Sequence, residues 1–206
     1  TDRRERGELW GLERDVWLPR GIVIPWLIDR ELWCVSIRRP AGEPKYCQVS
    51  GSSNALYCAD ALAPGRPAML VEGVFDALAV KQAAGDLVAA VASGSSGARH
   101  PRWIAKLALC SVVLVSFDAD QAGEAAAQWW LSVLSNGKRW RPYFDDPGAM
   151  AQAGIDLRFW VALGLGDKCS DPCAACSISE LCRFLRGLGA VPRCTTNNQK
   201  QLARAG

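Results

Sequence analysis

The feature that most constrains the fold is an apolar run that ends in two carboxylates. Residues 112–117 read Val-Val-Leu-Val-Ser-Phe without a charged side chain, and Asp118 and Asp120 follow directly. A short apolar run rich in β-branched residues is typical of a strand buried on both faces, as in a parallel sheet. Two carboxylates this close repel each other and are costly to bury without a cation. We therefore predict a parallel sheet with a divalent-metal site at one edge.

A second strand end carries a similar signal. Residues 68–71 predict another buried strand, which runs into Glu72, and Asp76 lies four positions later in a predicted helix. If the two strands are neighbours, all four carboxylates gather at the edge where open α/β sheets bind ligands. Aspartates hold Mg²⁺ there through water and substrate phosphates, and another carboxylate can act as a base. The alternative is that Asp118 and Asp120 only cap the next helix while Glu72 faces solvent; the two signals together favour a site.

The remaining pattern divides the chain into three regions. The turn-forming sequence Pro-Gly-Arg-Pro at 64–67 is the strongest internal boundary signal. Residues 1–66 are predicted to be a mainly β subdomain. Residues 67–165 alternate strands and helices, which predicts a parallel sheet flanked by helices. Residues 166–206 form a polar tail that holds five of the nine cysteines. The predicted fold class is therefore α/β, with a small β-rich subdomain before the sheet and a cysteine-rich tail after it.

Local patterns give further expectations for the ends of these regions. The charged segment 1–17 has a loose apolar stripe, and we predict a helix there. Residues 22–26 and 32–37 are predicted to be two strands, and residues 46–49 a third after the turn-forming segment 40–44. A short fourth strand of the parallel sheet is predicted at 141–144.

Composition narrows the class of protein. The net charge of +3 and pI near 8.4 are compatible with nucleic-acid binding but do not require it. The longest apolar run, 107–117, is too short to span a bilayer, and no secretory signal precedes the fold. Nine cysteines in that context favour reduced thiols or a metal site over a disulfide framework. We expect an intracellular protein, and the N-terminal threonine suggests a piece of a longer chain.

The tail cysteines form the second candidate metal site. Cys169, Cys173, Cys176 and Cys182 include a Cys-x-x-Cys pair, which places adjacent thiolates in one turn. Such thiolates suit tetrahedral Zn²⁺ or an iron–sulfur cluster. A bound metal would also supply the folding energy that a small polar tail lacks. The alternative is free thiols in a disordered tail.

Two motifs resemble a known family. Residues 70–79 (Leu-Val-Glu-Gly-Val-Phe-Asp-Ala-Leu-Ala) and 117–126 (Phe-Asp-Ala-Asp-Gln-Ala-Gly-Glu-Ala-Ala) are similar to the Toprim domain, and most similar to that of DnaG-type bacterial and phage primases. Residues 18–26 resemble the small β-rich subdomain before Toprim, and residues 153–161 resemble the segment that closes it. The resemblance covers residues 18–163.

The resemblance implies template-directed synthesis of RNA primers from ribonucleoside triphosphates on single-stranded DNA. It also implies a cytoplasmic protein of bacterial, phage or plasmid origin, with a replicative helicase as a partner and no membrane. Glu72 would be the acid/base carboxylate, Asp118 and Asp120 would bind Mg²⁺ or Mn²⁺, and Asp76 would complete the cluster. The basic positions that face nucleotide or template in the family correspond to Arg38, Arg39 and Lys45.

The sequence also departs from the family pattern. Residues 50–60 contain no Lys or Arg where the family has a basic residue, and Ala149 stands at the last acidic position of a motif near Asp146. The zinc module and the long basic region of full primases are absent from this sequence, so we expect polymerisation to depend on parts outside it. The other functions that the motifs allow are a metal-dependent nuclease, a topoisomerase-type strand transferase and a non-catalytic module that binds nucleic acid or a helicase.

Overall fold

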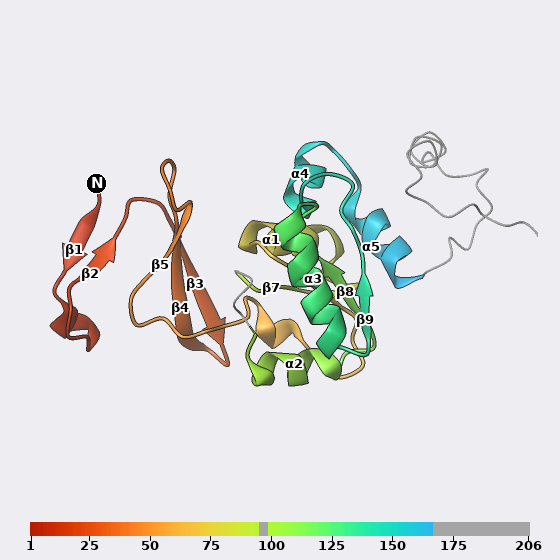
Figure 1. The fold of residues 1–206 in the computed structure, drawn as a ribbon, viewed down its shortest axis with the longest axis horizontal. Helices are drawn as coiled ribbons and strands as arrows, with labels where there is room; N and C mark the ends of the chain where they lie inside the picture. Colours follow the sequence, from red (N-terminus) through yellow and green to blue (C-terminus); the bar gives the residue numbers. More distant parts are fainter. Residues whose placement is uncertain (95–98, 167–206) are drawn as a thin grey trace, which may run out of the picture. The chain divides into compact units, whose positions relative to one another are not determined.

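A four-stranded parallel sheet lies at the centre of the computed structural model, which describes residues 1–94 and 99–166 (Figure 1). The strands follow the order β7-β6-β8-β9, and each neighbouring pair is parallel. Their bounds are Ala68–Val71 for β6, Ala89–Ala92 for β7, Val113–Ser116 for β8 and Gly137–Arg139 for β9. The predicted parallel sheet is confirmed.

Helices cover both faces of this sheet. Met69 and Val71 of β6 belong to a core cluster that also includes residues of α1 and α5, whereas Leu70 lies in a second cluster with residues of α2 and α3. This alternation follows from the two-residue period of a strand, and it explains why both β6 and β8, apart from Ser116, are apolar. The helices are α1 (Val74–Ala84), α2 (Pro101–Ala108), α3 (Gln121–Val133), α4 (Pro147–Gln152) and α5 (Leu157–Leu165).

An antiparallel sheet precedes the parallel one. It consists of β3 (Ile22–Ile28), β4 (Glu31–Arg38) and β5 (Tyr46–Gln48), and the short 3₁₀ helix η2 (Ala59–Ala61) follows it. Ile24 and Trp26 of β3 share one core cluster with Leu70 and the fully buried Trp103. The two sheets are therefore joined by a continuous apolar core within residues 1–166. The division at residue 66 stays a prediction.

The predicted N-terminal helix is wrong. Residues Arg3–Glu5 (β1) pair antiparallel with Val16–Leu18 (β2), and only a short 3₁₀ helix, η1 (Gly7–Trp10), lies between them. A Cβ atom on Gly7 would lie 2.2 Å from the carbonyl oxygen of Arg14, so this glycine allows the two arms to approach each other. Pairing between segments distant in sequence outweighed the local helical pattern.

The predicted fourth strand is also misplaced. It forms at Gly137–Arg139, before the predicted segment 141–144. The side-chain amide of Asn136 donates to the carbonyl oxygens of Leu107 (3.0 Å) and Cys110 (2.8 Å), which fixes the chain where β9 begins. The strand pairs with β8 on one side only, so it needs no apolar run, and its composition gave no strand signal.

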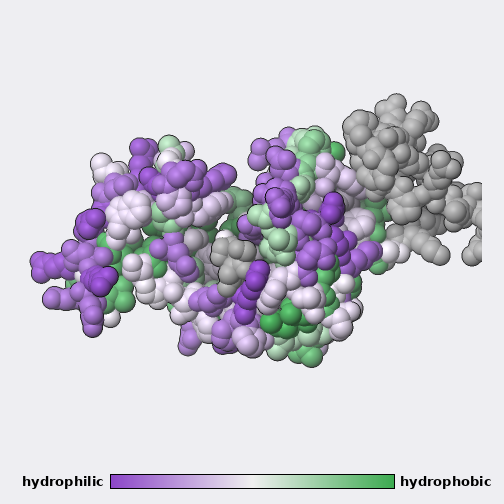
Figure 2. Space-filling model, viewed as in Figure 1, coloured by the Kyte–Doolittle hydropathy of each residue, from purple (hydrophilic) through white to green (hydrophobic). Residues whose placement is uncertain are grey.

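The surface of the molecule is mainly hydrophilic on the face that Figure 2 shows. Hydrophobic residues form smaller patches between the hydrophilic ones. Among the described residues, every helix is too short or too polar to cross a membrane.

Candidate metal centre

Two neighbouring strand ends bring the predicted carboxylates to one edge of the parallel sheet. In the register of β6 and β8, Val71 lies opposite Ser116. Glu72 follows Val71 directly, and Asp118 comes two residues after Ser116. Because the carboxyl ends of parallel strands meet at the same edge, both acidic side chains lie where such sheets bind ligands.

Asp76 joins this edge from the first turn of α1. It is 9% exposed, and its Oδ1 accepts a hydrogen bond of 2.9 Å from the backbone N–H of Gly148 at the start of α4. Asp146 caps the same helix by accepting a bond of 2.6 Å from the N–H of Ala149. Ala149 stands where the family pattern has its last acidic residue, and here its backbone N–H donates to the Asp146 carboxylate.

Burial and mutual repulsion disfavour the charged forms of these carboxylates. Burial raises the pKa of Asp76 to about 7, and the charge of Asp146 adds to the rise. Burial also raises the pKa of Asp118 to about 6, with the Glu72 charge as the next cause. The pKa of Glu72 is raised by burial and then by Asp120. These shifts are typical of acids gathered at a functional site, where a cation would restore the charged forms.

Asp120 belongs to the acidic edge and also caps the N-terminus of α3. It is exposed, it is the N-cap of α3, and its Oδ1 accepts a bond of 2.6 Å from the N–H of Gly123. A Cβ atom on Gly123 would lie 2.4 Å from the carbonyl oxygen of Asp118, so glycine lets the helix start directly against the acidic loop. The capping alternative therefore applies to Asp120, whose charge still acts on Glu72 and Asp118.

The donor set suits a hard divalent cation. Carboxylate oxygens are the ligands that Mg²⁺ and Mn²⁺ prefer, and Mg²⁺ keeps several waters while one or two carboxylates hold it. In residues 1–94 and 99–166, no three His, Cys, Asp or Glu side chains are arranged to hold a metal ion together. Burial raises the pKa of Asp76 and of Asp118, and neighbouring carboxylates add to both rises, so a cation here would favour the charged forms. The residues fit a cation bound partly through water.

The predicted basic residues lie around one cavity. Arg38, Arg39 and Lys45 line a cavity of about 610 Å³, together with Arg20. The Arg39 guanidinium donates to the carbonyl oxygen of Glu43 at 2.9 Å, which fixes one side of the cavity. Sequence reasoning missed Arg20, although it falls in the segment 18–26 that resembles the primase subdomain.

Arg38 links this cavity to the acidic edge. Its guanidinium carbon lies 4.6 Å from the ring centroid of Phe75, the neighbour of Asp76, and 5.9 Å from that of Tyr46. Burial raises the pKa of Tyr46, Arg38 opposes the rise, and Asp76 adds to it. A positive side chain and a phenol therefore lie near the carboxylates.

Sequence reasoning also missed Asp146 as a member of the acidic cluster. Its signal was an Asp directly before Pro147, a pattern typical of a helix N-cap with proline in the first turn. The predicted ligands Cys169, Cys173, Cys176 and Cys182 lie outside the described residues, so the zinc or iron–sulfur site stays a prediction.

A comparison with protein families identifies the domain that carries the acidic residues. Residues 69–147 match the model of a family described as Toprim-like. This segment is a Toprim-like domain. It contains Asp76, Asp118 and Asp120 as well as Glu72, and the resemblance stated from the sequence is confirmed. No curated protein sequence matches the chain.

Solved structures share the fold over about seven tenths of this chain. The primase fragment of the bacteriophage T7 primase-helicase protein matches with a TM-score of 0.57 and 17% identity, over 74% of this chain and 64% of that one. A DNA primase domain from Pseudomonas aeruginosa matches with a TM-score of 0.52 and 25% identity, over 69% and 50%.

A third structure shows the same core in a complex. The DnaG primase catalytic domain bound to single-stranded DNA matches with a TM-score of 0.55 and 19% identity, over 74% of this chain and 55% of that one. The chain thus spans about half to two thirds of these three relatives. It has the fold of a primase catalytic core.

Proposed function

We propose that the chain is a primase-like nucleotidyltransferase core that synthesises RNA primers on a single-stranded DNA template. The observation that carries this proposal is the placement of Glu72 and Asp118 at adjacent strand ends of a Toprim-like domain. The shared fold with primase catalytic cores supports it. The substrates would be the template and ribonucleoside triphosphates.

The acidic edge would hold the divalent cation. Asp76, Asp118 and Asp120 would bind Mg²⁺ or Mn²⁺, with Glu72 beside them as a further ligand. When bound, the cation would neutralise the charge that develops on the phosphoryl oxygens. Hydrogen bonds already hold Asp76 to Gly148 and Asp120 to Gly123, so these carboxylates need little reorganisation.

Glu72 would act as the base. In nucleotidyl transfer the 3′-oxygen of the primer bonds to the α-phosphorus while the bond to pyrophosphate breaks, and the hydroxyl proton must leave. Burial and the Asp120 charge raise the pKa of Glu72, which brings it closer to the operating pH. A carboxylate of this kind accepts the proton more readily than an ordinary glutamate.

The basic cavity would hold nucleic acid. Arg38, Arg39 and Lys45 would contact phosphates of the template or nucleotide, an interaction that weakens with salt. A replicative helicase is the proposed partner, because one structural relative is part of a primase-helicase protein. The proposed location is the cytoplasm, where replication takes place in bacteria and their phages.

Incorporation of labelled ribonucleotides on a single-stranded template tests this function. The wild-type chain is expected to give short products with Mg²⁺ or Mn²⁺ and none with EDTA. Glu72→Gln is expected to lower the rate by about 10²–10⁴-fold because a general base is lost. The matched control is Glu13→Gln at an exposed position, which should leave the rate unchanged.

Other outcomes would point to the alternative functions. Cleavage of the template would support a metal-dependent nuclease instead. The specific observation in favour of a non-catalytic module is that no three ligating side chains of the described residues are placed to hold a metal. Template binding without any product in either metal would support that module and reject the enzyme.

A further inference from the structure

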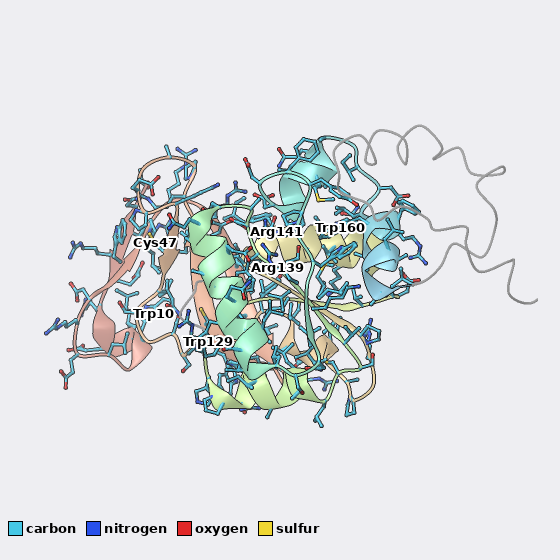
Figure 3. The ribbon with its side chains drawn as sticks, turned by 45° about the vertical axis from the view of Figure 1, so that its right-hand side comes forward. Trp10, Cys47, Trp129, Arg139, Arg141 and Trp160 are labelled. Carbon is cyan, nitrogen blue, oxygen red and sulfur yellow. The ribbon has the colours of Figure 1, made fainter. Side chains whose placement is uncertain are left out.

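Arg139 of β9 contacts the end of β8, the residue Phe117 that follows it, and the first turn of α3. Its side chain is labelled in Figure 3, together with that of Arg141. Its guanidinium donates to the carbonyl oxygens of Val115 at 3.0 Å and Phe117 at 3.2 Å, and its Nε donates to Glu124 at 3.1 Å. The Arg139 side chain is only 14% exposed. Val115 and Phe117 lie just before Asp118 in the sequence, and Glu124 lies one helical turn after Asp120.

The Arg139 guanidinium hydrogen-bonds to β8 and to Phe117 where the backbone pairing of β8 and β9 ends. The last paired residues of β8 and β9 are Val115 and Arg139, and the N–H of Trp140 donates to Val115 at 3.0 Å. Phe117 lies beyond this last rung, and Arg139 supplies the donor to its carbonyl oxygen. The next residue is Asp118, so the side chain of Arg139 fixes the peptide that carries the first carboxylate.

Glu124 lowers the free-energy cost of burying the Arg139 guanidinium, because it pairs with that charge. The carboxylate lies on the first turn of α3 and binds Arg139 and also Arg141, at 2.9 Å. A paired and hydrogen-bonded charge avoids the cost of burying an isolated one. The side chain of Arg141 is 66% exposed and contacts the same carboxylate. Among the described residues it makes no hydrogen bond to β8, so Arg141 is a matched control.

We propose that Arg139 is a positioning residue, which holds the Phe117–Asp118 peptide and the start of α3 so that Asp118 and Asp120 face Glu72. It acts through the backbone and through Glu124 and touches no substrate. Its effect on metal binding rests on the proposed function. Its effect on the order of the loop does not.

Hydrogen exchange of the loop amides tests the positioning role directly. The probes are the N–H of Ala119, which donates to the Asp145 carbonyl oxygen at 2.8 Å, and the N–H of Gly123, which donates to Asp120. Arg139→Gln removes the hydrogen bonds to both carbonyl oxygens, so both amides should exchange at least about 10-fold faster. Arg139→Lys keeps the charge but has a single donor nitrogen in place of the planar guanidinium, so its exchange rates should lie in between. Arg141→Gln should match the wild type.

Mn²⁺ titration of the same variants separates the two claims. Arg139→Gln is expected to weaken Mn²⁺ binding about 10–100-fold, as is usual when a group that orients a metal ligand is removed. Equal loop exchange in Arg139→Gln and Arg141→Gln would overturn the positioning role, whatever the metal does. Failure of the wild type to bind Mn²⁺ would overturn the proposed function, and faster exchange in Arg139→Gln would then still support the positioning role.

Discussion

Asp118→Asn is expected to lower primer synthesis by about 10³-fold, because a bound divalent ion contributes several kcal/mol to a transition state and each 1.36 kcal/mol is tenfold in rate. Asp118 lies two residues after the end of β8, and the charges of Glu72 and Asp146 both act on it. Asparagine keeps the size of the side chain and removes the charge. The measurement is the rate of ribonucleotide incorporation at saturating Mg²⁺ and Mn²⁺.

Two variants separate this effect from a loss of folding. Asp120→Asn should also reduce the rate, although asparagine can still cap α3 and so preserve the helix. Asp15→Asn removes one carboxylate from an exposed position and should change nothing. If Asp118→Asn and Asp15→Asn had equal rates, Asp118 would have no part in the reaction.

The free energy of unfolding of the metal-free protein is expected to fall as the pH rises from about 4 to 8, owing to Asp76. Burial and Asp146 raise the pKa of folded Asp76 to about 7, above that of the unfolded chain. The folded state therefore binds a proton that the unfolded state has released, and this stabilisation is lost as the pH rises through the folded pKa. The expected loss is on the order of 2–4 kcal/mol.

Urea unfolding in EDTA at pH 5 and pH 8 measures this effect. Asp76→Asn should remove most of the difference between the two pH values, because its amide does not titrate. Adding Mg²⁺ at pH 8 should restore stability to the wild type, since ligands that bind only the folded state stabilise it. The account of Asp76 would fail if wild type and Asp76→Asn had the same pH dependence.

The sheet and its acidic edge were predictable because their signals are local. The run 112–117 is apolar at every position except Ser116, so it must be buried on both faces, and Asp118 then has to lie at a strand end. The same reasoning applies to residues 68–71 and Glu72. That β6 and β8 are direct neighbours is a tertiary fact, which the sequence left as a condition and the structure shows.

The contacts that complete the site depend on tertiary structure. Arg139 lies next to Lys138 and near Arg141 in the sequence, yet its side chain donates to the carbonyl oxygens of Val115 in β8 and of Phe117 just after it. Asp146 approaches Asp76 only because α4 starts against α1. At the N-terminus, β1 and β2 pair across η1, and no local pattern shows such pairing. Helix periodicity in a charged segment was a weak guide there.

Anomalous diffraction from crystals of the chain grown with Mn²⁺ tests the central claim most directly. We predict a manganese peak at the carboxyl end of β6 and β8, bound by the Asp118 carboxylate together with Glu72 or Asp76. The peak should be absent in Asp118→Asn crystals grown in the same way. No peak at saturating Mn²⁺, or a peak only at a site away from Glu72, Asp76 and Asp118, would contradict a metal-dependent nucleotidyltransferase centre at this edge of the sheet.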